Sequence, residues 1–217
     1  MPLIVHSVPL WAAATNCYVI ARGPGGPAVV IDAPPDAAGT ARLLADIGCY
    51  PEALLVTHGH IDHVGGAGRL VSDTSVTAYL HPDDLWLAMD PESQLRSLFG
   101  TSAVPGDFAP PERFGDLGHG DALDLAGLSV GVVHTPGHTP GHCCFYLEDE
   151  GALFSGDQLF AGSIGRTDLP GGDHAALMRS MVERVLTFPP GIDVLPGHGP
   201  TTTLAVERRS NPFLQGL

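Results

Sequence analysis

One ten-residue stretch limits what this chain can fold into more than any other feature. Residues 57–66 (Thr-His-Gly-His-Ile-Asp-His-Val-Gly-Gly) hold three histidines and an aspartate within six positions. The stretch follows Ala-Leu-Leu-Val at residues 53–56, a short apolar run typical of a buried strand. The pattern therefore predicts a strand that ends in a polar loop, with a helix opening after the glycines near Leu70 and Val71.

The spacing inside this loop suggests metal ligation. If the chain is still extended at its start, His58 and His60 point to the same side, because strand side chains repeat every two residues. Asp62 and His63 then fall where the chain turns and can reach a second point nearby, so one loop could hold two neighbouring cations. The alternative is a solvated polar loop with chance histidines. Further histidines in tight turns downstream favour the metal hypothesis.

Composition limits the class of protein and its partners. The chain has 217 residues, of which 44% are hydrophobic and 16% charged, which predicts one globular domain spanning residues 1–217. The net charge is −14, and all ten basic residues are arginines. Such a charge disfavours nucleic acids and anionic membranes as partners. We expect a small-molecule substrate, and an anionic one would have to be bound by particular arginines.

Cysteine usage and the N-terminal residues indicate the compartment. Cys17, Cys49, Cys143 and Cys144 show no CxxC spacing and are expected to be buried thiols in a reducing compartment. Residues 1–14 contain no cationic leader, and no apolar run reaches the ~18 residues of a membrane span. These features predict a soluble, cytoplasmic protein.

The order of expected elements predicts the fold class. Alternating or continuous apolar runs predict strands at residues 3–10, 17–21, 28–32, 53–57, 76–80, 122–125, 128–134, 143–147, 152–155 and 192–195. Asp36 and Asp173 are expected to cap two helices, and residues 203–209 to form a last one. Because the order strands–helix–strand–helix occurs twice, we expect an α+β fold with two sheets facing each other and helices outside.

Residues 82–120 differ from the rest of the chain. Prolines, few branched aliphatic residues and scattered large apolar side chains predict a short helix and a long loop. Either these aromatics only attach the segment to the core, or part of it forms one wall of the substrate cleft, since long ordered loops are often functional.

Three later segments carry further ligand chemistry. Residues 134–142 (HTPGHTPGH) form a rigid Pro/Gly turn between two expected strands. Residues 154–157 (FSGD) end a strand with a carboxylate, and residues 195–199 (LPGHG) end another with an imidazole. Strand ends on one rim of a sheet sandwich would bring these groups together.

Together with the HxHxDH loop, these segments resemble the metallo-β-lactamase superfamily over nearly the whole chain. Within it the chain looks most like the short, single-domain glyoxalase II type, the hydroxyacylglutathione hydrolase-like proteins; residues 162–168 (GSIGRTD) and 211–214 (NPFL) add to that. The resemblance implies a four-layer αββα sandwich with its metals at one sheet edge. It also implies hydrolysis of a thioester such as S-lactoylglutathione by a metal-bridging hydroxide, which the catalytic carboxylates Asp62 and Asp157 would hold.

The same resemblance implies a set of seven metal ligands. One metal would be bound by His58, His60 and His138, the other by Asp62, His63 and His198, and Asp157 would bridge both. Five imidazoles and two carboxylates suit two zinc ions, with iron or manganese as alternatives. Longer glyoxalase II enzymes bind glutathione through basic residues of a C-terminal helical extension, whereas this chain ends at Leu217 and has no lysine. The thiol carrier therefore stays open.

Several polar residues keep two interpretations. His134 and His142 either orient the ligand turn or are ordinary capped or exposed residues, and Asp32 either orients a ligand or caps a turn. Arg166 either binds substrate or pairs with Asp168. Structural or solvated roles are expected for His6, His81, His119 and His174.

Rival functions use the same residues. A related family, persulfide dioxygenase, would hold a single iron with His58, His138 and Asp157. A non-catalytic metal-binding protein is disfavoured, because structural zinc sites are closed and usually rich in cysteine. β-Lactam or lactone hydrolysis and nuclease activity are minor options, and the acidic balance counts against a nuclease.

Overall fold

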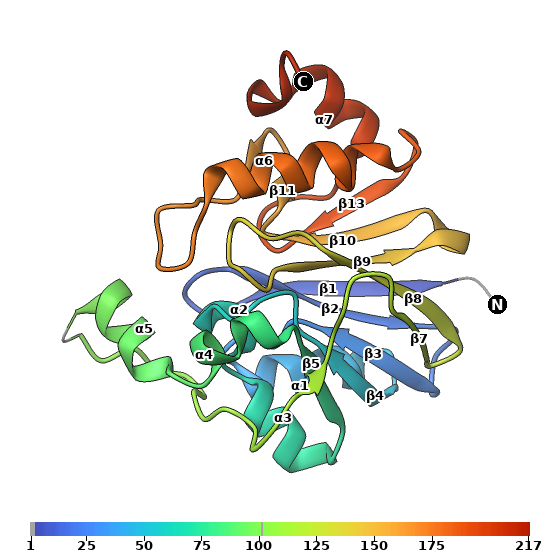
Figure 1. Ribbon diagram of the computed structural model, residues 1–217. Coiled ribbons are helices and arrows are strands. Elements are labelled where there is room, and N and C mark those ends of the chain that lie inside the picture. The colour runs from blue at the N-terminus through green and yellow to red at the C-terminus, as the bar shows by residue number, and fades with distance from the viewer. Residues whose placement is uncertain (1–2, 101) are drawn as a thin grey trace.

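Two six-stranded sheets pack face to face in the computed structural model, which describes residues 3–100 and 102–217 (Figure 1). The first sheet runs in chain order and consists of β1 (Ile4–Leu10), β2 (Thr15–Ala21), β3 (Pro27–Ile31), β4 (Tyr50–Leu55), β5 (Thr77–Leu80) and β6 (Gly115–Asp116). The second has the order β14-β13-β10-β9-β8-β7 and consists of β7 (Ala122–Leu125), β8 (Leu128–His134), β9 (Cys143–Leu147), β10 (Ala152–Gly156), β13 (Asp193–Pro196) and β14 (Thr202–Thr203). A small hairpin joins β11 (Leu159–Phe160) to β12 (Ser163–Ile164).

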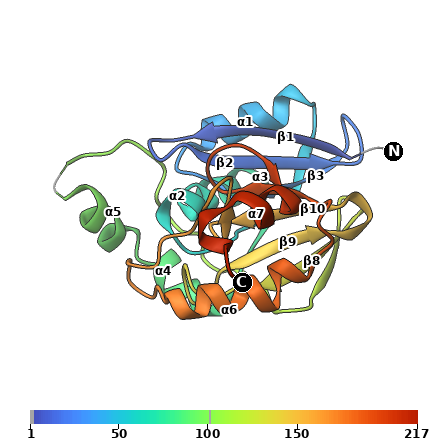
Figure 2. The same cartoon turned by 90° about the horizontal axis from the view of Figure 1, so that it is seen from above.

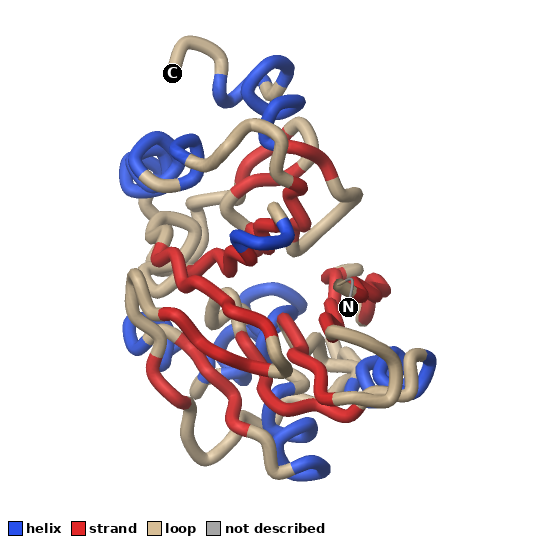
Figure 3. The backbone as a smooth tube through the Cα atoms, turned by 90° about the vertical axis from the view of Figure 1, so that its right-hand side faces the viewer, coloured by secondary structure: helices blue, strands red, loops and turns tan. Residues whose placement is uncertain are grey.

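Helices cover the outer faces of both sheets, with α1 and α3 on one side and α6 and α7 on the other (Figures 1 and 3). The α-helices are α1 (Ala37–Asp46), α2 (Ile61–Val64), α3 (Ala67–Thr74), α4 (Leu85–Ala88), α5 (Pro91–Phe99), α6 (His174–Glu183) and α7 (Leu204–Ser210). Short 3-10 turns occur at η1 (Pro82–Asp84), η2 (Glu148–Glu150), η3 (Val185–Thr187) and η4 (Pro212–Leu214). Asp36 and Asp173 cap α1 and α6 as predicted. In the described part of the chain, no helix is long and apolar enough to cross a membrane.

Period-two alternation in the strands divides the core into three layers. Within β4, Leu54 packs into the outer layer under α1 and α3, while Leu55 enters the layer between the sheets. In β10, Phe154 enters the same central layer and Leu153 packs outward against α6. Neighbouring apolar residues thus bury on opposite faces, because side chains alternate across a strand. The predicted αββα sandwich is confirmed.

The parallel pairs place the loops that carry polar residues at one edge. Strands β3, β4 and β5 are parallel, as are β10 and β13, so the carboxyl ends of each set lie together. Backbone contacts connect the two sheets at this edge. Thr15 of β2 pairs with His198 in an isolated β-bridge, and the Cys143 N–H donates to the Thr57 carbonyl at 2.7 Å. The edge shared by both sheets is therefore where the functional residues gather.

Two local predictions differ from the structure. The chain after the histidine loop turns helical at Ile61, before the glycines, so Asp62 and His63 lie on α2 itself. In the described part of residues 82–120 there are two α-helices, α4 and α5, where one was expected. Helix α5 begins at Pro91, because Asp90 accepts a hydrogen bond from Ser93 N and Pro91 suits the first turn. Helix α5 has no buried residue and projects from the sandwich in both Figure 1 and Figure 2.

Candidate metal centre

The first group of ligands consists of three imidazoles. His58 Nε2 lies 3.1 Å from His60 Nδ1, which lies 2.9 Å from His138 Nε2, and the third side of this triangle is 3.2 Å. The corners of such a triangle lie about 1.8 Å from a common centre, close to the ~2.0–2.1 Å of a zinc–nitrogen bond. All three side chains are buried. These three nitrogens could together hold a single cation.

The hydrogen bonds of this group fix which nitrogens carry protons. His138 Nδ1 donates to the Arg166 carbonyl at 2.7 Å. The Thr57 hydroxyl donates to the Asp32 carboxylate, so it accepts from His58 Nδ1 at 3.0 Å. When the two rings are neutral, the Nε2 atoms of His58 and His138 therefore carry no proton, and their lone pairs face each other.

Burial keeps these rings neutral. It lowers the pKa of His58 well below its ordinary value, that of His138 to about 4 and that of His60 to about 3. Opposed lone pairs at 3.2 Å repel unless a cation lies between them. The donor set therefore fits a metal ion.

The second group attracts positive charge. Asp62 Oδ2 lies 3.2 Å from His198 Nε2 and 3.4 Å from His63 Nε2, and the two imidazole nitrogens are 3.3 Å apart. Burial alone would lower the pKa of His63, but the carboxylates of Asp62, Asp157 and Asp32 raise it to about 10. This position stabilises a cation, whether a proton or a metal.

Asp157 lies between the two groups. Its Oδ1 is 3.4 Å from His63 Nε2, and its Oδ2 is 3.5 Å from His138 Nε2 and 3.6 Å from His198 Nε2. Oδ1 is buried and has no hydrogen-bond partner among the described residues. An unpartnered buried carboxylate oxygen is costly, so this atom also fits a missing cation.

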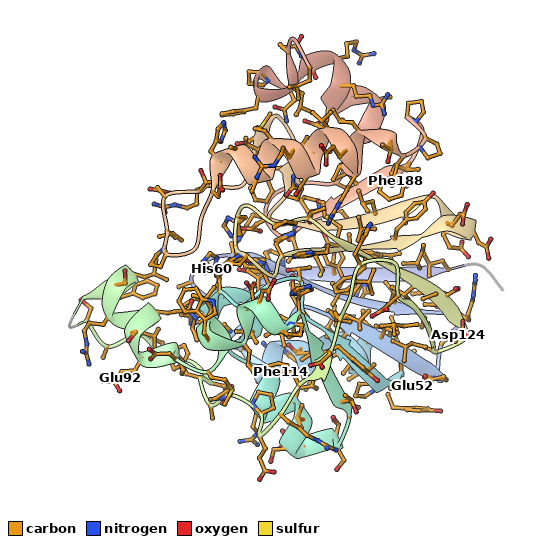
Figure 4. The ribbon with its side chains drawn as sticks, viewed as in Figure 1. Glu52, His60, Glu92, Phe114, Asp124 and Phe188 are labelled. Atoms are coloured by element: carbon orange, nitrogen blue, oxygen red, sulfur yellow. The ribbon has the colours of Figure 1, made fainter. Side chains whose placement is uncertain are left out.

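A cavity of about 310 Å³ opens over both groups. His60, which Figure 4 shows at the end of the sandwich beside α4 and α5, lines it together with Asp62, His138, Asp157 and His198. Trp86 and Leu87 of α4 and Gln94 and Leu98 of α5 line the opposite wall. Of the two roles left open for residues 82–120, the structure supports both: Ala88 and Phe114 pack on the core, and Trp86 and Leu98 line the cavity.

A family model described as the metallo-beta-lactamase superfamily matches residues 10–203. The chain belongs to this superfamily. It is 35% identical to the hydroxyacylglutathione hydrolase GloC of Haemophilus influenzae, with 97% of each chain covered. The fold and the histidine–aspartate clusters together imply divalent metal ions.

Solved structures of similar proteins agree with this assignment. The BLEG-1 B3 metallo-beta-lactamase has a TM-score of 0.87 at 35% identity, covering 98% of this chain and 100% of the other. TTHA1623, solved in a di-iron-bound form, has a TM-score of 0.84 at 41% identity, covering 96% and 99%.

In this metallo-β-lactamase fold, two side chains left open by the sequence hold the ligands in place. Asp32 accepts from His63 Nδ1 and from Thr57 N, both at 2.8 Å. His142 Nε2 accepts from the Asp157 N–H at 3.0 Å, and its Nδ1 lies 2.8 Å from the Thr135 hydroxyl. Both are therefore placed to orient candidate metal ligands.

His134 and Arg166 lie nearer the margin of the centre. His134 Nε2 lies 2.8 Å from the Pro140 carbonyl, and its ring stacks on His81 with centroids 4.0 Å apart. Arg166 lines the cavity while its guanidinium forks onto Asp168 at 2.7 and 2.8 Å. Its role in substrate binding stays a prediction.

The sequence pattern did not single out Asp84, which is fully buried behind the centre. Its carboxylate accepts from Gly59 N at 2.8 Å, from Gly141 N at 2.6 Å and from the Thr139 hydroxyl at 2.6 Å. A Cβ on either glycine would lie 2.7 Å from the Asp84 backbone, which explains both glycines. Nothing in the local pattern of residues 81–84 distinguishes this aspartate from its exposed neighbour Asp83.

Gln94 of α5 was also missed. Its side-chain oxygen accepts from Ile61 N at 2.9 Å, and its amide donates to the Gly59 carbonyl at 3.0 Å and to the Leu87 carbonyl at 2.8 Å. Gln94 thereby ties α5 to the histidine loop, a contact that no short-range sequence signal predicts.

Proposed function

We propose that this protein is a metal-dependent hydrolase that cleaves a thioester, with S-lactoylglutathione as the reference substrate. The single observation that carries the proposal is that two groups of donor side chains lie on either side of the Asp157 carboxylate and open onto a cavity on one side. The likeness to a hydroxyacylglutathione hydrolase supports the thioester. Structural metal sites, by contrast, are closed.

The proposal assigns each ligand a place. His58, His60 and His138 would hold one divalent ion and Asp62, His63 and His198 the other, with Asp157 between them. The all-nitrogen and oxygen donor set suits zinc, with iron or manganese as alternatives. When bound, the two cations would act as Lewis acids toward the carbonyl oxygen and lower the pKa of a water to about 7.

The chain's own residues would orient the reacting groups. Asp62 Oδ2 accepts from the Thr15 hydroxyl at 2.9 Å, which fixes that carboxylate beside the cavity. Asp62 and Asp157 would hold the attacking water. Leu98 and Trp86 on the opposite wall would limit the entry of bulk water.

The leaving group needs no dedicated acid. Water adds its oxygen to the carbonyl carbon, the carbon–sulfur bond breaks, and the products are a carboxylic acid and a free thiol. A thiol has a pKa of about 8.5, so the thiolate leaves readily and takes its proton from solvent. This fits a cavity whose described lining offers no obvious general acid for the leaving thiolate.

The test pairs metal content with turnover. Unsupplemented protein, measured by mass spectrometry, is expected to hold two metal ions per chain and to cleave S-lactoylglutathione. Asp157→Ala is expected to lose at least one ion and to lower kcat by about 1,000-fold or more, because it removes the bridging carboxylate.

Three outcomes would contradict the proposal. Full activity in the Asp157→Ala variant would exclude the bridging role. A single bound iron with oxygen uptake on glutathione persulfide would instead favour the dioxygenase, and metal binding without turnover of any thioester would favour a non-catalytic protein.

A further inference from the structure

Outside the metal ligands, the wall of the cavity is mostly apolar. It is lined by Trp11, Trp86, Leu98, Phe99, Leu169 and Pro170. Trp86 is 51% exposed and Leu98 is 44% exposed, which is unusual for such large side chains beside a polar centre. Apolar surface left open in a concave site is available to bury part of a ligand.

This wall is preformed. The Trp86 ring lies so close to Gly171 that a Cβ there would be 3.2 Å from Trp86 Cζ2. On the other side, Trp11 packs edge-on against Phe99 and Phe108 with ring centroids 5.6 and 5.9 Å away. The Trp11 indole also donates to the Pro105 carbonyl at 2.8 Å. Trp11 is therefore held in place before any ligand arrives.

The outer cavity offers almost no free positive charge. Among the described lining residues Arg166 is the one basic side chain, and both of its hydrogen bonds are to Asp168. Asp90 adds a carboxylate to the rim, where it accepts from Ser93 N at 3.1 Å and has no salt bridge to a described residue. The rim is thus neutral to acidic.

The charge of the metal centre does not change the neutral to acidic character of the cavity. Two divalent cations would bring four positive charges, and four carboxylates lie in or directly behind the centre: Asp32, Asp84 and Asp157, which are buried, and Asp62, which is partly buried. An approaching molecule would then respond to the rim and to the net charge of −14.

We infer that this site selects thioesters whose thiol carrier is uncharged and apolar, and discriminates against carriers with free carboxylates, glutathione included. The inference rests on the proposed thioester hydrolysis and names its substrate class. The apolar wall binds the carrier, and the unpaired Asp90 together with the neutralised Arg166 excludes carboxylates.

A matched pair of substrates tests the inference. N-acetyl-S-lactoylglutathione carries two carboxylates, and its diethyl ester carries none, while the acyl group and the bond that breaks are identical. We expect kcat/KM at low salt to be about tenfold higher for the diester, mainly through KM. The ratio of kcat/KM for the diester to kcat/KM for the dicarboxylate should shrink in 1 M salt, where the screening length falls to about 3 Å.

Charge variants locate the effect. Asp168→Asn frees Arg166, and Asp90→Asn removes the rim carboxylate but keeps a cap for α5. Each is expected to raise kcat/KM for the dicarboxylate about threefold relative to the diester. Asp73→Asn changes net charge equally on α3, away from the cavity, and should leave the ratio unchanged.

The outcomes separate the two proposals. Equal or better cleavage of the dicarboxylate at low salt would overturn the carrier selectivity while thioester hydrolysis stands. An unchanged ratio in both the Asp90 and Asp168 variants would overturn the assigned residues. Failure to cleave either thioester, with metal bound, would overturn the proposed function and the selectivity with it.

Discussion

The imidazole of His63 is held from behind by the Asp32 carboxylate at 2.8 Å. The same carboxylate accepts from both the amide and the hydroxyl of Thr57, which in turn accepts from His58. One aspartate therefore orients a ligand of each group. A carboxylate bonded to the back of an imidazole fixes its tautomer and raises its strength as a ligand.

Replacing Asp32 with asparagine should weaken the centre. An amide cannot accept from three donors in this geometry, so one N–H or O–H would face the asparagine NH₂ group. We expect metal affinity, measured by chelator competition, to fall about 10- to 100-fold.

The matched control is Asp36→Asn, which keeps the cap of α1 and lies outside the ligand contacts. It should leave metal affinity unaltered. Wild-type affinity in the Asp32 variant would argue that this contact only packs the loop.

At the scale of elements, the first group depends on two loops from different sheets. The loop after β4 carries His58 and His60, and the turn between β8 and β9 carries His138. Asp84, at the start of α4, bonds to the backbone of both loops. The segment that forms the cavity wall thus also aligns the ligands.

Asp84→Asn should destabilise this junction. The amide would leave at least one of the three donors unpaired in a buried position, for a loss of about 2–3 kcal/mol in the free energy of unfolding. Urea denaturation of the metal-free protein measures this loss. The exposed neighbour offers the control, since Asp83→Asn should change stability by less than about 0.5 kcal/mol. Equal effects of the two substitutions on stability would show that Asp84 does not hold the two loops together.

At the scale of the whole molecule, folding buries titratable groups at the shared edge of the two sheets. His60 and His138 have pKa values of about 3 and about 4, mainly through burial. His63 moves the other way, to about 10, because the neighbouring carboxylates outweigh burial. The stability of the metal-free protein should therefore depend on pH in two opposite directions.

Stability should be greatest near pH 6.5. As the pH falls from 6.5 to 4, the unfolded chain binds protons that folded His60 and His138 do not, so each costs up to about 3 kcal/mol of stability. As the pH rises from 6.5 toward 10, the stabilisation from protonated His63 is lost. Urea unfolding of chelator-treated protein at pH 4.5, 6.5 and 9 measures both limbs.

A control fixes the source of this profile. His174→Gln, at an exposed position of α6, should leave the pH profile unchanged. A flat profile in the metal-free protein would contradict the assigned pKa shifts.

The sequence by itself determined the pieces of this protein that depend on local spacing. Strand alternation, the aspartate caps of α1 and α6 and the tight His/Gly/Pro loops are short-range patterns, and they predicted the αββα sandwich, which is confirmed. The seven ligand candidates came from four short motifs together with the resemblance to the metallo-β-lactamase superfamily. The single domain and the cytoplasmic location stay predictions.

Only the tertiary structure decided how those pieces meet. The bonds of Asp32 and Asp84 join residues that lie 25 or more positions apart. The cavity likewise brings α4 and α5 close to His138 and Asp157. Such contacts depend on the order and register of strands in two sheets, which local periodicity does not encode. The pairing of Arg166 with Asp168 is local; the sequence offered it as one of two roles, and the folded loop shows the guanidinium on Asp168.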